Sequence, residues 1–181
     1  MMTPEEYSFI KNISKLYPNG DIIVAGTYNG GDVRSFYKGD EKRNIVVIDS
    51  FEGLAEPTKP DMAEDYMEQG KCNIGGLEKY LKTFEGTDFS PPTEIYKMWI
   101  DANSLKSIKE RKVSILFLDL DHYQPTKDCL EYFFSWIKED GIVVVHDYDF
   151  VRCPGIKTCC DDFKPGWRKI KGTGFGILEV K

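Results

Sequence analysis

The chain has 181 residues, of which 41% are hydrophobic and 30% are charged, a composition typical of one globular domain. Its 24 lysines and arginines are outnumbered by 30 aspartates and glutamates, and the net charge of −6 argues against nucleic-acid and anionic-membrane partners, which bind basic surfaces. No apolar run approaches the ~20 residues that span a bilayer, and we expect a single domain over residues 1–181.

The five cysteines are scattered along the chain and form no CxxC pair, which argues against a disulfide framework or a structural zinc site. Such cysteine usage is typical of a reducing compartment, so a cytoplasmic location is expected. The sequence opens with two methionines, a start that is consistent with a domain taken from a longer polypeptide.

The first fifty residues alternate between helical and strand patterns. A helix is predicted after Thr3 and Pro4, with apolar residues at positions 7, 10, 13 and 16 on one face. Residues 21–25 (DIIVA) form the first predicted strand, which ends at the glycine-rich turn 26–31 (GTYNGG). A short helix over 32–37 follows, and residues 44–48 (NIVVI) form a second buried strand that ends at Asp49 and Ser50.

Residues 50–92 are the least regular part of the chain, with prolines at positions 57, 60, 91 and 92. Two helices are expected there, over residues 62–68 and 77–84. A segment of this length beside a strand end is a candidate lid or ligand-binding insertion.

The second half of the chain continues the alternation of strands and helices. Strands are predicted at 94–100, at 113–118 (VSILFL) and at 141–145 (GIVVV), with helices at 125–137 and 155–163 between and after them. Residues 167–170 and 176–180 resemble a closing hairpin. The pattern predicts a Rossmann-like α/β fold, in which helices cover both faces of a mostly parallel sheet and the terminal hairpin adds an antiparallel strand.

Open sheets of this kind bind ligands at the carboxyl ends of their strands, so the residues that follow each strand are the candidates for a site. The glycines of 26–31 let the backbone approach a ligand, and the next helix amino terminus favours an anion, although such a turn is more often only a tight connection. Asp49 ends the second strand, where an acid can accept both hydroxyls of a ribose. The alternative role for Asp49 is that of a helix cap.

The two histidines of the chain both follow predicted strands, each beside an aspartate. Asp119, Asp121 and His122 follow the fourth strand, and His146 and Asp147 follow the fifth. Carboxylates and imidazoles that converge from neighbouring strands suit a divalent cation. The alternative is a set of hydrogen-bonded loop residues, but two facing histidine–aspartate pairs favour a site.

Four segments carry a family resemblance. GTYNGG (26–31), DSFEGL (49–54), FLDLDHYQPTKDCLEYF (117–133) and GIVVVHDYDFVRCPGIKTCCDDF (141–163) resemble, in this order, the macrocin O-methyltransferase-like family of class I S-adenosylmethionine-dependent methyltransferases. The glycine turn is the least specific of the four. The resemblance implies an enzyme that methylates sugar hydroxyls on natural products or glycans, in many members with a bound magnesium ion.

By position, the resemblance also implies which residues contact the cofactor and a metal. Contacts with S-adenosylmethionine are implied for Gly26, Tyr28, Gly30, Asp49, Ser50, Phe51, Trp99 and Asp101. Asp119, His146 and Asp147 match the positions of metal ligands, for Mg²⁺ or Mn²⁺, and Asp119 would thereby act in catalysis. His122 matches the place where some members carry the catalytic base.

Two departures from the family pattern bear on the site. Val24 stands where many relatives have an acidic residue, so the methionine ammonium group of the cofactor loses a partner or finds it elsewhere. His146 replaces an acidic metal ligand and makes the site less negative, which leaves Mg²⁺, a softer Mn²⁺ or Zn²⁺, or no metal as alternatives.

The resulting hypothesis is a metal-assisted, S-adenosylmethionine-dependent O-methyltransferase that acts on a sugar or glycan hydroxyl, with a catechol or phenol as the second acceptor class. A degenerate methyltransferase fold that serves as an interaction module is one rival. A nucleotide-binding oxidoreductase is another, although the turn does not match G-x-G-x-x-G. The exact acceptor, the oligomeric state, and fusion to or association with glycan-synthesis enzymes stay open.

Overall fold

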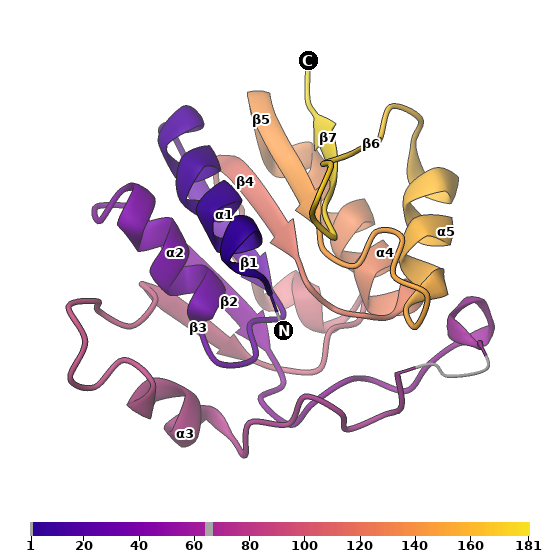
Figure 1. Ribbon diagram of the computed structural model, residues 1–181, viewed down its shortest axis with the longest axis horizontal. Helices are drawn as coiled ribbons and strands as arrows, with labels where there is room; N and C mark the ends of the chain where they lie inside the picture. Colours follow the sequence, from indigo (N-terminus) through magenta and orange to yellow (C-terminus); the bar gives the residue numbers. More distant parts are fainter. Residues whose placement is uncertain (1, 64–66) are drawn as a thin grey trace.

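The computed structural model describes residues 2–63 and 67–181 and contains one mixed β-sheet (Figure 1). Among the described residues the sheet has seven strands in the order β3-β2-β1-β4-β5-β7-β6. The parallel strands are β1 (Asp21–Ala25), β2 (Ile45–Asp49), β3 (Glu94–Lys97), β4 (Val113–Leu118) and β5 (Ile137–Val145). The hairpin of β6 (Arg168–Lys169) and β7 (Gly176–Glu179) closes the sheet, with β7 antiparallel to β5. The predicted fold class is therefore confirmed.

Two hydrophobic cores cover the two faces of this sheet because successive strand residues point to opposite sides. On one face, Ile22 and Val24 of β1 pack with α1 (Pro4–Leu16), α2 (Gly31–Gly39) and α3 (Leu77–Lys82). On the other, Ile23 and Ala25 pack with α4 (Tyr123–Phe133) and α5 (Pro154–Phe163). Figure 1 shows α1 and α2 lying side by side across the sheet.

Helix α1 begins with a capping box formed by Thr3 and Glu6. The hydroxyl of Thr3 accepts a hydrogen bond from the backbone N–H of Glu6 at 3.3 Å, and the Glu6 carboxylate accepts one from the N–H of Thr3 at 2.7 Å. These bonds satisfy two backbone N–H groups that have no partner within the helix. Pro4 suits the first turn because an N–H group at that position would also lack a partner within the helix.

Several predicted boundaries differ from the observed ones. β3 ends at Lys97 rather than at residue 100, and α4 ends at Phe133, where a 3₁₀ helix (Phe134–Trp136) follows. β5 begins four residues before the predicted strand, and its register against β4 shifts between Val113 and Ile115. Asp140, in a left-handed conformation with φ of 63°, lies within this irregularity, which an apolar-run pattern does not reveal.

The helix expected over residues 62–68 falls partly on residues 64–66, which lie outside the described residues. Residues 62, 63, 67 and 68 are not helical, and a short 3₁₀ helix (Lys59–Asp61) precedes them. The buried carboxylate of Asp61 accepts hydrogen bonds from the N–H of Thr58 at 2.7 Å and from that of Tyr123 at 2.6 Å. This part of the 50–92 segment is thereby attached to the start of α4.

The sheet order brings the carboxyl ends of β1, β2, β4 and β5 to one edge, with β1 between β2 and β4. Strands β2 and β4 lie on opposite sides of β1, so the strand order reverses at β1. Open α/β sheets bind ligands at such a topological switch point. In the part of the chain that the structure describes, no helix combines the length and hydrophobicity needed to cross a membrane.

Candidate functional site

A cavity of about 750 Å³ opens at this edge of the sheet. Its walls come from the turn after β1, the ends of β2, β4 and β5, helix α1, the 50–92 segment and the closing hairpin. The candidate residues that line it are Gly26, Tyr28, Asp49, Ser50, Trp99, Asp119, His146 and Asp147. The fold therefore brings most of the predicted site residues to one cavity of a size typical for small-molecule ligands.

Four candidate residues do not line the cavity. Gly30 is the N-cap of α2, where an added Cβ would come within 2.9 Å of the Phe84 ring. Phe51 is 1% exposed and packs on Tyr80 with ring centroids 4.9 Å apart. Asp101 is exposed and accepts hydrogen bonds from the N–H groups of residues 103 and 104, so it stabilises a local turn. The fourth residue is His122.

A close contact between the ends of two strands requires a glycine in the turn after β1. Gly26 has φ of +78°, and a Cβ at this position would lie 2.0 Å from the carbonyl oxygen of Asp119. The end of β1 therefore comes into close contact with the end of β4, which only a glycine permits. This contact places the turn beside the acidic residues that follow β4.

Asp49 lies at the end of β2 and supports the same turn. One carboxylate oxygen accepts a hydrogen bond from the Thr27 N–H at 2.9 Å, and the other accepts one from the Phe51 N–H at 2.5 Å. Burial raises the pKa of Asp49, while these two N–H donors oppose the rise. Each oxygen retains a lone pair, so the half-buried carboxylate is fixed in place and can still accept hydrogen bonds from a ligand in the cavity.

Backbone strain is concentrated at this edge of the sheet. Non-glycine residues with positive φ follow each of four strand ends: Tyr28 after β1, Phe51 after β2, Asp121 after β4 and Asp147 after β5. Such conformations cost free energy and cluster at binding and catalytic sites. This regularity supports a functional site there, and the sequence patterns gave no sign of it.

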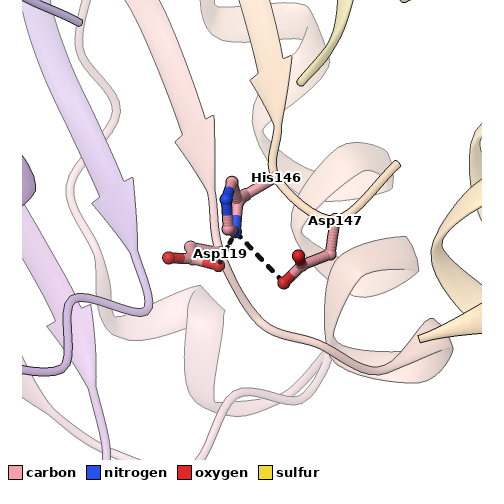
Figure 2. A group of neighbouring side chains, drawn as sticks. All are labelled: Asp119, His146 and Asp147. Carbon is pink, nitrogen blue, oxygen red and sulfur yellow. Dashed lines mark hydrogen bonds and ion pairs between the residues drawn. The ribbon is translucent and has the colours of Figure 1, made fainter. Parts of the chain in front are cut away.

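Three side chains from β4 and β5 converge in the cavity, as Figure 2 shows. The Nδ1 atom of His146 lies 2.9 Å from Oδ1 of Asp119 and 3.1 Å from Oδ2 of Asp147. His146 is 8% exposed, and its backbone N–H donates a hydrogen bond to the carbonyl of Leu118 at 2.8 Å, which fixes the backbone that carries the ring. Asp119, His146 and Asp147 of the two expected histidine–aspartate pairs therefore meet, whereas His122 does not join them.

A third carboxylate reaches His146 from the opposite side. The Oε1 atom of Glu6, on α1, lies 3.5 Å from Nε2 of His146 and accepts a hydrogen bond from the Gly174 N–H at 2.7 Å. Burial by itself lowers the pKa of His146, but Asp119, Asp147 and Glu6 together raise this pKa well above its ordinary value. In this arrangement the imidazole is the cationic centre of a carboxylate cluster.

The same donor set fits a divalent cation. Ligand atoms of Asp119, His146 and Asp147 all lie within 4.8 Å of one another, and two carboxylates with one imidazole form a common site for such ions. Nδ1 must lose its proton to act as a ligand. Glu6 is placed to accept a hydrogen bond from the N–H that remains at Nε2, which is the usual role of a carboxylate behind a metal-binding histidine.

Asp121 also lines the cavity, although the sequence assigned it no separate role. Burial, together with the nearby Asp147 carboxylate, raises the pKa of Asp121 above its ordinary value. The Cys153 thiol donates a hydrogen bond to its Oδ1 at 3.4 Å. The raised pKa makes Asp121 a stronger proton acceptor than an ordinary carboxylate.

His122 occupies a different environment. It is 1% exposed, and its Nε2 lies 2.7 Å from the carbonyl oxygen of Met67, to which it donates. Its Nδ1 is buried and finds no hydrogen-bond partner in residues 2–63 and 67–181. The ring lies behind the cavity wall and holds the 50–92 segment, so a role as catalytic base stays a prediction that this geometry does not favour.

Sequence reasoning also missed Glu6 and Asp32. Both are buried acids that line the cavity. The Thr3–Glu6 capping signature identifies a helix start, but no sequence signal links it to His146. Asp32 stands directly after the glycine turn, and this adjacency was the one available indication that it could reach the site.

Comparison with known proteins places the chain among methyltransferases. The sequence model of the family described as Macrocin-O-methyltransferase (TylF) matches residues 8–172. The 8-demethyl-8-(2,3-dimethoxy-alpha-L-rhamnosyl)-tetracenomycin-C 4'-O-methyltransferase of Streptomyces olivaceus is 26% identical over 153 residues, which are 74% of this chain and 55% of the relative. Demethyldecarbamoylnovobiocin O-methyltransferase of Streptomyces niveus is 24% identical over 159 residues, which are 80% of this chain and 58% of the relative. The chain thus spans little more than half the length of these two relatives.

Solved structures agree on the fold. The O-methyltransferase NovP superposes with a TM-score of 0.77 at 19% identity, over 97% of this chain and 79% of NovP. The calicheamicin methyltransferase CalS11 gives a TM-score of 0.73 at 20% identity, over 98% of this chain and 80% of CalS11. An O-methyltransferase from Bacillus cereus, solved in complex with SAH, gives a TM-score of 0.66 at 13% identity, over 99% of this chain and 82% of that protein.

Proposed function

The chain belongs to the macrocin O-methyltransferase family, and on this premise we propose that it transfers the methyl group of S-adenosylmethionine to a hydroxyl oxygen of a sugar-bearing acceptor. The observation that carries the proposal is the single cavity at the carboxyl ends of the strands, in which Asp49 and the Asp119–His146–Asp147 cluster lie together. One end of this cavity suits a nucleoside and the other suits an acceptor oxygen.

The cofactor half of the cavity is built around Asp49. Its carboxylate, oriented by the N–H groups of Thr27 and Phe51, would accept the two ribose hydroxyls. Trp99 lines the wall beyond β3 and is 42% exposed, so its ring is available to an adenine. Gly26 and Tyr28 line the wall next to β1, where the methionine portion would extend.

The catalytic half is built from the ends of β4 and β5. Asp119, His146 and Asp147 would hold a divalent cation such as Mg²⁺ or Mn²⁺, which when bound supplies a Lewis acid for the acceptor hydroxyl. Glu6 would keep the His146 ring oriented, and its negative charge compensates for a neutral ligand at that position.

The protein contributes mainly position to the methyl transfer. The sulfonium already activates the methyl group, so the bond from sulfur to carbon breaks as the bond from acceptor oxygen to carbon forms, and the charge on sulfur is lost. The hydroxyl proton needs an acceptor in the cavity. Asp121 lines the cavity beside Asp147 and suits this role, whereas His122 would first have to release the carbonyl of Met67.

The acceptor side of the cavity has aromatic surface. Phe150 lines it next to the metal-ligating cluster and is 43% exposed, as is fitting for a ring that stacks on a sugar face. Leu54 and Met67 of the 50–92 segment also line the cavity and support a role for this segment in enclosing the acceptor. The two Streptomyces relatives are named for rhamnosyl-tetracenomycin and novobiocin substrates, and this agrees with a sugar-bearing acceptor.

Free cysteines support a reducing, cytoplasmic environment. The thiols at positions 72, 129, 153, 159 and 160 are all unpaired, and four of these five are buried. We also retain the expectation that residues 1–181 act as one domain, because the cavity draws on elements from α1 to the closing hairpin.

Calorimetry tests the cofactor class. S-adenosylmethionine and its demethylated product should both bind with one-to-one stoichiometry, and NAD should not bind. Binding of NAD in place of S-adenosylmethionine would favour an oxidoreductase. Failure to bind any of these nucleotides would favour an interaction module that has lost catalysis.

A further inference from the structure

Asp32 is a buried acid that has no cationic partner among the residues the structure describes. It is the second residue of α2, is 3% exposed and lines the cavity. Its Oδ1 accepts hydrogen bonds from the Thr27 hydroxyl at 2.8 Å and from the Val33 N–H at 2.7 Å. Its Oδ2 is buried and has no hydrogen-bond partner. The N-cap of this helix is Gly30, so Asp32 is not needed as its cap, and a serine or threonine hydroxyl at this position would leave no carboxylate oxygen unpaired.

The surroundings of Asp32 favour binding of a cation next to its carboxylate. Asp49 and Asp119 contribute further negative charge and, with burial as the main cause, raise the pKa of Asp32 to about 7. The basic residue next along the helix, Arg34, is turned away: its guanidinium donates to the carbonyls of Asn29 and Thr83 and lies over the Phe84 ring. Val24, at the end of β1, is fully buried in the apolar core and supplies no charge.

We propose that Asp32 is the receptor for the α-ammonium group of the methionine portion of S-adenosylmethionine. This inference rests on the proposed function, which places the ribose at Asp49 and the methionine portion along the wall that Gly26 and Tyr28 form. The methionine tail then extends along the glycine turn toward α2. There the helix amino terminus suits its carboxylate, and the free Oδ2 of Asp32 suits its ammonium group.

A buried acid in this role selects among cofactor analogues. A ligand that keeps the ammonium group gains a charge-assisted hydrogen bond and neutralises the carboxylate. A ligand without that group leaves Oδ2 unpaired, as it is in the free protein. Asp32 therefore discriminates for the amine of the cofactor, separately from the recognition of ribose by Asp49.

The test compares two ligands in matched variants. S-adenosylhomocysteine and its deaminated analogue, which keeps the carboxylate, are titrated calorimetrically into the wild type, Asp32→Asn and Asp32→Ser. Glu41→Gln, which removes one exposed acid near the end of the same helix, is the control for net charge. We expect the wild type to bind the deaminated analogue about 10- to 100-fold more weakly. Both Asp32 variants should lose this preference while binding the deaminated analogue as the wild type does.

Four results would overturn the inference. Equal affinity of the wild type for both ligands would exclude an amine receptor even if the variants did not fold. An equal loss for both ligands in the Asp32 variants would assign Asp32 a structural role only. Unchanged binding of S-adenosylhomocysteine in folded variants would remove Asp32 from the site while the proposed function stands. A wild type that binds neither nucleoside ligand would refute the proposed function together with this inference.

Discussion

The carboxylate of Glu6, at the start of the first helix, lies 3.5 Å from Nε2 of His146, at the end of β5. Glu6 is held by the N–H groups of Thr3 and Gly174 at 2.7 Å each, so three distant parts of the chain meet at one carboxylate. The helix cap and the orientation of the imidazole are thereby coupled. Helix α1 is in this way part of the site and also part of the scaffold.

Replacing Glu6 should affect both stability and metal binding. Glu6→Ala leaves the backbone N–H groups of Thr3 and Gly174 without an acceptor. We therefore expect the free energy of unfolding, measured with denaturant, to fall by about 1–3 kcal/mol. Mn²⁺ binding should weaken about 10- to 100-fold because the His146 ring loses its partner. Glu5→Ala, at the exposed neighbouring position, should change neither quantity. Unaltered Mn²⁺ affinity in a folded Glu6→Ala protein would show that Glu6 serves α1 alone.

Asp49 is expected to contribute to cofactor affinity. Asp49→Ala removes a charged acceptor for the ribose hydroxyls and should weaken S-adenosylmethionine binding by about 1.5–3 kcal/mol. The same carboxylate supports the turn at Thr27, so far-ultraviolet circular dichroism must first establish that the variant is folded. A folded variant with the wild-type dissociation constant would exclude Asp49 from the ribose site.

The two candidate proton acceptors can be separated by mutation. Asp121→Asn should lower kcat by about 10²- to 10⁴-fold and leave the affinity for S-adenosylmethionine within a few fold, because a proton acceptor acts in the chemical step. His122→Gln keeps a side-chain amide that can donate to the Met67 carbonyl, so its kcat should fall far less. The reverse ranking of the two variants would identify His122 as the base.

Much of this fold could be predicted because its strands carry strong local signals. The apolar runs IVVI (45–48) and VSILFL (113–118) are each followed by an aspartate, and these positions indicated the ligand-binding edge correctly. Other features depend on long-range contacts. The Glu6–His146 contact joins opposite ends of the chain, and the burial of His122 follows from a hydrogen bond to Met67 within an irregular segment. Neither contact can be predicted from the hydrophobic periodicity or from the local spacing of residues.

Asp32 makes the stability of the ligand-free protein depend on pH. Its pKa is about 7 when folded, against 3.8 as its ordinary value, so the folded state binds more protons between these two values. Stability should therefore fall as pH rises from about 4 to about 7. In Asp32→Asn this part of the slope should be missing, a difference on the order of 2–4 kcal/mol across the range. Parallel pH profiles of unfolding free energy for the two proteins would show that Asp32 ionises normally.

The most direct test of the account is transfer of a labelled methyl group. The protein is incubated with methyl-labelled S-adenosylmethionine, Mg²⁺ or Mn²⁺, and separate panels of glycosides, catechols, DNA and protein. Asp147→Asn serves as the control for the proposed metal site. We predict label on a sugar hydroxyl oxygen, with activity that a chelator abolishes and that falls sharply in the Asp147 variant. Label confined to catechols, or found only on nitrogen atoms of a macromolecule, would contradict sugar O-methylation.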